Sequence, residues 1–257
     1  MSLDVSAPFS LDGRTAIVTG ASSGLGERFA RVLHAAGCTV IVGARRRERL
    51  DGLAAELGER LVPVTCDVSI DDDLAALHAV ALEAGSGRID VLVNNAGIGG
   101  MIPAEVEDPA SFRGVFDVNV TGVFVLSQLC ARTMLEQGSG SIINIASILG
   151  LVAAAPIVQA SYCASKGGVV NLTRELAAQW ARKGIRVNAL APGWFPSEMT
   201  AEMVVDDSSI AFVQRTAPMG RFGQEHELDG ALLFLASDAS TYCTGQVLTV
   251  DGGWTAR

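Results

Sequence analysis

A tyrosine and a lysine stand four residues apart in the stretch Ser161-Tyr162-Cys163-Ala164-Ser165-Lys166. On a helix, Tyr162 and Lys166 share one face about one turn apart. A free tyrosine has a pKa near ~10 and is a poor acid or base at neutral pH. An ammonium held about 4 Å from the phenol oxygen would favour the phenolate by ~4 kcal/mol at an effective dielectric constant of ~20. That corresponds to roughly three pKa units before desolvation removes part of it. The spacing therefore predicts a general acid/base that works near neutral pH.

A simpler interpretation competes with this one. A half-buried tyrosine can pack beside a lysine that extends to solvent, and a bare YxxxK pattern favours that arrangement. The elements around Tyr162 and Lys166 have to decide between the two.

Short apolar runs alternate with amphipathic stretches along the chain. Strands are predicted at 15–19, 39–43, 61–65, 89–93, 141–146, 186–190 and 246–250. Helices are predicted between them, among others at 46–57, 110–137 and 225–237, and one carries Tyr162 and Lys166 as far as Gly184. Continuous apolar strands are typical of a parallel sheet covered on both faces. We predict one α/β domain over residues 1–257, a Rossmann-type doubly wound parallel sheet of about seven strands, with an insertion at 194–224. A TIM barrel fits the length, but the glycine-rich turn after the first strand favours the open sheet.

Composition limits the classes of function. The formal net charge of −9 argues against a nucleic-acid or anionic-membrane partner. Five cysteines without a CxxC pair or a Cys/His cluster indicate buried thiols in a reducing cytoplasm, with no disulfide and no metal site. The N-terminus lacks the pattern of a signal peptide. The uncharged stretch 142–165 is predicted to be a strand, a loop and a helix start, not a membrane span.

A glycine-rich turn follows the first predicted strand. Thr19 to Gly26 reads T-G-x-x-x-G-x-G. Glycines at such a turn allow backbone N–H groups at a helix N-terminus to approach a pyrophosphate. The turn predicts dinucleotide binding by Gly20, Gly24, Leu25 and Gly26.

Several further motifs accompany this turn. They are Asn94-Asn95-Ala96-Gly97, Asn119, Ser147, the Tyr162/Lys166 pair and Pro192-Gly193. Together with the turn, in this order and spacing, they resemble the short-chain dehydrogenase/reductase family. The resemblance runs from Leu11 to Trp254, and it favours the catalytic interpretation of Tyr162 and Lys166. It implies hydride transfer that interconverts a ketone and a secondary alcohol.

The resemblance implies four catalytic roles. Tyr162 would exchange a proton with the substrate oxygen, and Ser147 would hydrogen-bond the same oxygen. Lys166 would lower the pKa of Tyr162 and hold the nicotinamide ribose. Asn119 would hold a water that links Lys166 to solvent. Two donors and a matched proton source suit carbonyl reduction.

The end of the second strand bears on the choice of cofactor. Family members that prefer NAD usually carry an aspartate there, whereas this chain has Gly43-Ala44-Arg45-Arg46. Arg45 is placed to meet a 2′-phosphate, so NADP(H) is favoured. Arginines that simply begin a helix in solvent are the alternative, which leaves NAD(H) open. The resemblance implies further cofactor contacts from Ser22, Ser23, Arg46, Asp67, Val68, Asn95, Ala96, Gly97, Tyr162, Lys166, Pro192, Gly193, Phe195 and Ser197.

The resemblance also bears on substrate and assembly. The 194–224 insertion is predicted to be a substrate lid, and its apolar residues indicate an apolar carbonyl or alcohol substrate. A carrier-protein substrate is disfavoured, because Glu136-Gln137-Gly138-Ser139 holds no base. Enoyl reductases of the wider family space their tyrosine and lysine more widely. A cytoplasmic homotetramer is expected. The alternatives are an NAD-dependent secondary-alcohol dehydrogenase and a non-catalytic dinucleotide sensor, which would usually lack one of the four catalytic residues.

Overall fold

The computed structural model describes residues 5–256, so the two ends of the predicted 1–257 domain lie outside it. Seven parallel strands form one sheet in the order β3-β2-β1-β4-β5-β6-β7. They are β1 (Thr15–Thr19), β2 (Thr39–Ala44), β3 (Leu61–Thr65), β4 (Val91–Asn94), β5 (Gly140–Ile145), β6 (Ile185–Pro192) and β7 (Val247–Val250). The predicted Rossmann-type fold is confirmed.

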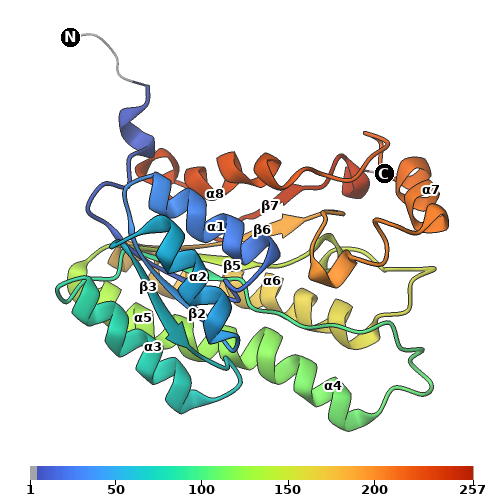
Figure 1. The fold of residues 1–257 in the computed structure, drawn as a ribbon, viewed down its shortest axis with the longest axis horizontal. Coiled ribbons are helices and arrows are strands. Elements are labelled where there is room, and N and C mark those ends of the chain that lie inside the picture. The colour runs from blue at the N-terminus through green and yellow to red at the C-terminus, as the bar shows by residue number, and fades with distance from the viewer. Residues whose placement is uncertain (1–4, 257) are drawn as a thin grey trace.

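Helices cover both faces of the sheet (Figure 1). One layer holds α1 (Gly24–Ala35), α2 (Arg47–Leu57) and α8 (Asp229–Ala236), and the other holds α3 (Asp71–Ala84), α5 (Gly122–Gln137) and α6 (Ala160–Trp180). Each layer buries its own apolar cluster against the sheet, which explains why the strands are apolar on both faces. Two further helices, α4 (Pro109–Phe116) and α7 (Asp207–Thr216), lie towards the right in Figure 1, α7 above and α4 below.

The predicted helix at 110–137 is interrupted by a π-helical turn over Asp117–Thr121. The whole run Pro109–Gln137 is long and apolar enough to cross a membrane by length and composition alone. Its residues Leu126, Cys130 and Met134 are fully buried in the cluster beneath the sheet. The apolar character of this run therefore serves the core. The stretch 142–165 forms the end of β5, a loop and the start of α6, as predicted.

The turn between β1 and α1 has no room for a side chain at two of its glycines, Gly20 and Gly26. A Cβ added to Gly26 would lie 2.3 Å from the Gly20 carbonyl oxygen and 2.4 Å from Asn95 Nδ2. We expect Gly26→Ala to lower the free energy of unfolding by about 1–3 kcal/mol, the cost of overpacking a filled site. Gly52 lies exposed in α2, and a Cβ added there would have nothing within 4 Å, so Gly52→Ala should raise the free energy of unfolding by about 0.5–1 kcal/mol. Urea unfolding measures the free energy of unfolding of both variants. If Gly26→Ala and Gly52→Ala changed it equally, the turn would have room for a side chain at Gly26.

Candidate active site

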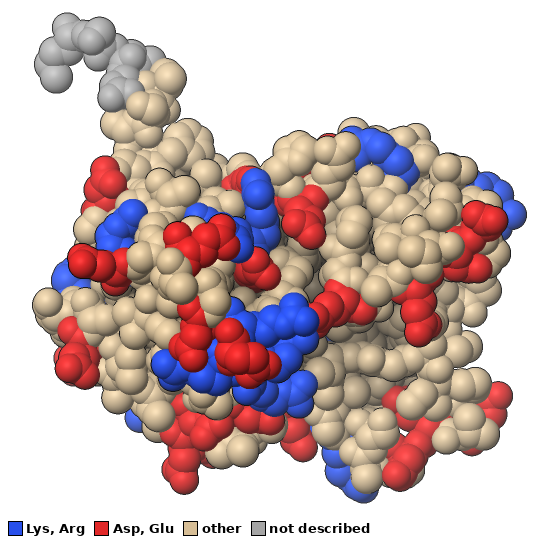
Figure 2. Space-filling model, viewed as in Figure 1, with Lys and Arg blue, Asp and Glu red and all other residues tan. Residues whose placement is uncertain are grey.

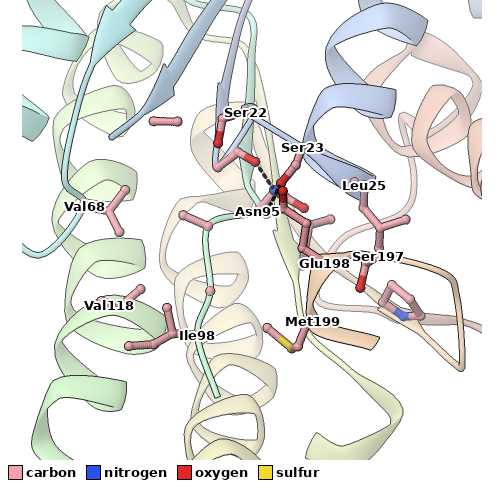
Figure 3. Close-up of a pocket in the computed structure, with 18 of the residues that line it drawn as sticks. Ser22, Ser23, Leu25, Val68, Asn95, Ile98, Val118, Ser197, Glu198 and Met199 are labelled. Atoms are coloured by element: carbon pink, nitrogen blue, oxygen red, sulfur yellow. Dashed lines mark hydrogen bonds between the residues drawn. The ribbon is translucent and has the colours of Figure 1, made fainter. Parts of the chain in front are cut away.

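A cleft opens where the strand order reverses, between β1 and β4. In doubly wound sheets, ligands bind at this point, beyond the carboxyl ends of the strands. The cleft has a volume of about 440 Å³. Figure 3 shows Ser22 and Ser23 at its upper end, Ile98 and Val118 on one side, and the segment with Ser197, Glu198 and Met199 on the other.

The cleft gathers every residue that the sequence predicted for cofactor binding. They are Gly20, Ser22, Ser23, Gly24, Leu25, Gly26, Arg45, Arg46, Asp67, Val68, Asn95, Ala96, Gly97, Tyr162, Lys166, Pro192, Gly193, Phe195 and Ser197. Of the four predicted catalytic residues, Ser147, Tyr162 and Lys166 line the cleft. The fourth, Asn119, is fully buried behind it.

Tyr162 and Lys166 lie on one side of α6, as their spacing predicts. The Lys166 Nζ atom lies 5.7 Å from the centroid of the Tyr162 ring and donates a hydrogen bond of 2.7 Å to the Ile145 carbonyl. Only 4% of Lys166 is exposed. The lysine is thus no snorkelling side chain, and the simpler interpretation of the pair is wrong on this point.

A chain of buried hydrogen bonds fixes α6 against the sheet. Asn94 on β4 donates to Ser127 on α5 and to Asn144 on β5, both at 2.9 Å. Asn144 in turn donates to Thr173 on α6 at 3.0 Å. Buried polar networks of this kind hold their members rigidly when every group is paired. The network ties α6 to β5, and Ser147 lies two residues after the end of that strand.

The pKa of Tyr162 departs from the sequence prediction. Burial raises the pKa of Tyr162 above its ordinary value, and the hydrogen bond with Ser147 offsets only part of that rise. Burial also lowers the pKa of Lys166 to about 8. This direction is opposite to the lowering of the tyrosine pKa that the sequence predicted from the lysine charge. The Lys166 ammonium is bound to the Ile145 carbonyl and is almost fully buried, whereas Tyr162 is partly buried.

Asn119 is held by three hydrogen bonds inside the π-helical turn. Its Nδ2 atom donates to the Ile98 carbonyl at 2.8 Å and to Ser165 Oγ at 2.9 Å, and its Oδ1 atom accepts from the Ile98 N–H at 2.8 Å. Both amide donors are therefore already used. The side chain joins the loop after β4 to α6 beside Lys166, so it positions the site. π-helical turns inside α-helices often mark such functional sites.

The glycine turn fits the pyrophosphate of a dinucleotide. Ser23 precedes α1 in an extended conformation, and no side chain among residues 5–256 caps this helix. Gly20 has a φ of 66°, and a Cβ there would lie 2.8 Å from the Ala96 Cα atom. The free N–H groups and the positive end of the helix dipole favour an anion. The donor set of the turn suits the cofactor that the sequence predicted.

The two neighbouring arginines behave differently. The Arg46 guanidinium donates to the hydroxyls of Ser22 and Ser23 at 3.0 and 2.8 Å. Arg45 lies near Asp67, whose pKa is lowered by hydrogen bonds from Ser69 and then by the Arg45 charge. The sequence analysis favoured Arg45 for contact with a 2′-phosphate. In the structure, however, Arg46 is the arginine that is hydrogen-bonded to the two serines.

Sequence reasoning missed one charged residue of the cleft, Glu198. Its carboxylate pairs with Arg46 through contacts of 2.9 and 2.8 Å and accepts from Ser23 Oγ at 2.8 Å. Figure 2 shows basic side chains gathered beside a central hollow, with acidic atoms facing them across it. Only the position of Glu198 directly after Ser197 could have signalled its place in the cleft.

The segment 194–224 packs beside the catalytic residues. Trp194, Met203 and Val213 are buried in a cluster with Ile148 and Leu149, and Tyr162 packs against this cluster. The segment also forms α7. Among its predicted apolar residues, however, Met199, Val205 and Met219 are exposed. Some apolar residues of this segment therefore serve its packing against the protein, so their apolar character does not by itself indicate an apolar substrate.

Known proteins resemble this chain along its whole length. The sequence profile described as "Enoyl-(Acyl carrier protein) reductase" matches residues 20–255. Galactitol 2-dehydrogenase (L-tagatose-forming) of Cereibacter sphaeroides is 42% identical over 98% of this chain and 99% of its own. Gluconate 5-dehydrogenase of Gluconobacter oxydans is 41% identical over 96% of each chain. The chain belongs to the short-chain dehydrogenase/reductase family.

Solved structures of the family share this fold closely. The structure of a gluconate 5-dehydrogenase from Burkholderia cenocepacia, in complex with NADP and tartrate, has a TM-score of 0.91 at 40% identity, and covers 97% of this chain and 98% of its own. The chain is an NAD(P)-dependent oxidoreductase of the family that acts on CH–OH groups. Residues 5–256 contain no group of three or more His, Cys, Asp or Glu side chains arranged to hold a metal ion.

Proposed function

We propose that this chain is an NADP(H)-dependent oxidoreductase that interconverts a ketone and a secondary alcohol. One observation carries the proposal. A single cleft holds Ser147, Tyr162 and Lys166 together with the basic group formed by Arg46 and two serine hydroxyls. One bound NADP(H) could thus place its nicotinamide beside Tyr162 and its 2′-phosphate beside Arg46.

The bound nicotinamide dinucleotide would supply or accept the hydride. The chain's own residues would handle the proton. Tyr162 would donate it to the substrate oxygen or remove it, and Ser147 would hydrogen-bond the same oxygen. Lys166 would hold a positive charge beside the phenol, and the pyrophosphate would lie against the turn from Gly20 to Gly26.

Two observations support NADP(H) over NAD(H). Arg46 and the two serines offer the planar guanidinium and hydroxyl donors that a phosphate requires. Three similar solved structures, at 40–42% identity, also contain bound NADP. An NAD-dependent alcohol dehydrogenase remains the alternative, and the pairing of Arg46 with Glu198 favours it.

The charges of the cleft bear on the substrate. Among the described residues that line it, the cations are Arg45, Arg46 and Lys166, and none of these is free beside Tyr162 to bind a substrate carboxylate. We therefore propose an uncharged ketone or alcohol, held under the 194–224 segment as a lid. The names of two relatives contain polar substrates, the neutral polyol galactitol and the carboxylate gluconate, so they do not support the predicted apolar substrate. A cytoplasmic homotetramer is part of the same proposal.

Cofactor affinity tests the proposal most directly. We expect NADPH to bind the wild type more tightly than NADH, and Arg46→Ala to weaken NADPH binding by about 10- to 100-fold, the range for losing hydrogen bonds to a charged group. Arg45→Ala serves as the matched control and should have a smaller effect, because Arg45 lies beside Asp67. Calorimetry with both cofactors measures these affinities. Tighter binding of NADH by the wild type would move the assignment to NAD.

A further inference from the structure

The anion-binding group at the upper end of the cleft already holds an anion from the chain itself. Arg46 contributes a bidentate guanidinium, Ser22 and Ser23 contribute hydroxyls, and the carboxylate of Glu198 lies between them. Arg49 adds a second positive charge 3.9 Å from Glu198 Oε1. These are the donors that a phosphate would use.

The partners of this contact come from segments of the cleft lining that are far apart in the sequence. Arg46 precedes α2, and the serines belong to the turn after β1. Glu198 begins the short 3₁₀ turn Glu198–Thr200 in the 194–224 segment, 152 residues further along the chain than Arg46. In Figure 3, Glu198 reaches up towards Ser23 from that segment. The contact therefore ties the proposed lid to the proposed 2′-phosphate site.

Glu198 is bound as an anion at every pH of practical interest. The Arg46 and Ser23 hydrogen bonds lower the pKa of Glu198 to about 2. Because this value lies below the ordinary value of 4.5, the contact keeps its strength above about pH 4.5 and loses it only as the pH falls through about 2.

We propose that Glu198 determines cofactor selectivity by occupying the 2′-phosphate site, so that NADP(H) must displace it whereas NAD(H) need not. This inference rests on the proposed function, since it uses the same site. The Arg46 guanidinium cannot bind the Glu198 carboxylate and a phosphate at the same two N–H groups, and the two anions would repel each other there. Glu198 thus lowers the affinity for the phosphorylated cofactor and leaves that for NAD(H) nearly unchanged. Displacement by the 2′-phosphate would also release the lid from the wall that holds the adenosine.

The test replaces the charge and keeps the shape. We expect Glu198→Gln to bind NADPH about five- to tenfold more tightly than the wild type, in line with the loss of a partly exposed charge pair and of the repulsion. Binding of NADH should change less than about twofold. Adenosine 2′,5′-bisphosphate and adenosine 5′-monophosphate, which differ only in the 2′-phosphate, should show the same contrast in calorimetry. Glu202→Gln is the matched control, because Glu202 is exposed in the same segment and lies outside the cleft.

The outcomes separate the two proposals. Tighter binding of NADPH and the bisphosphate by Glu198→Gln alone supports the inference. If the wild type binds NADPH but Glu198→Gln behaves like Glu202→Gln, or binds NADPH more weakly, the inference is overturned and the proposed function stands. If no form binds NADPH or the bisphosphate, both the NADP(H) assignment and the inference fail.

Discussion

Tyr162→Phe should lower kcat by at least ~10²-fold, the low end for the loss of a general acid/base. The change removes only the phenol oxygen, while the ring keeps its packing against the apolar cluster beside the cleft. Cofactor affinity should therefore stay within about twofold of the wild type. Steady-state kinetics with NADPH and a neutral ketone, together with calorimetry, measure both quantities.

A matched control exists for this variant because the chain holds one other tyrosine. Tyr242 is fully exposed, so Tyr242→Phe should leave kcat and cofactor affinity unchanged. Near-normal turnover in Tyr162→Phe would remove Tyr162 from the proton-transfer role. Loss of cofactor binding in the same variant would instead show that the phenol supports the structure of the site.

The architecture was predictable because local signals agree along the chain. Continuous apolar runs, glycines at helix ends and the turn from Thr19 to Gly26 all indicate the same doubly wound sheet, and each predicted strand is found within about two residues. The cleft was predictable for the same reason. Ser147, Lys166 and the glycine turn each follow or face the carboxyl end of a strand, so the topology alone brings them together.

What could not be predicted depends on where side chains point. Arg45 and Arg46 are indistinguishable by type, and only the structure shows that Arg46 turns towards the serines. The partner of Arg46, Glu198, lies on a different segment with no motif to join the two. The predicted lowering of the Tyr162 pKa assumed a distance of about 4 Å between the phenol oxygen and the Lys166 ammonium. In the structure the ammonium donates to the Ile145 carbonyl, and burial raises the pKa of Tyr162.

Lys166→Met should make the protein more stable and less active at once. Burial lowers the pKa of Lys166 from 10.5 to about 8, so the unfolded chain binds this proton more tightly than the folded protein does. The lysine therefore costs stability below about pH 8, and the cost fades as the pH rises towards 10.5. The difference between the two pKa values corresponds to roughly 3 kcal/mol at neutral pH.

Methionine keeps most of the apolar stem and removes the charge. It also removes the hydrogen bond to the Ile145 carbonyl, worth about 1 kcal/mol. We therefore expect the free energy of unfolding at pH 7 to rise by about 1–2 kcal/mol, with a smaller gain at pH 10. Turnover should fall by at least ~10²-fold, because the positive charge beside Tyr162 is lost.

Urea unfolding at the two pH values and steady-state turnover test this pair of effects together. Lys183 is the chain's other lysine and is exposed, so Lys183→Met should change neither the free energy of unfolding nor the turnover. A Lys166→Met variant that is less stable at pH 7 would show that Lys166 is a structural residue whose hydrogen bond outweighs its buried charge. A stable variant with normal turnover would separate Lys166 from catalysis. A gain in stability with a loss of turnover would mean that the fold keeps an ammonium out of water at its own expense, which is the expected cost of a residue retained for chemistry.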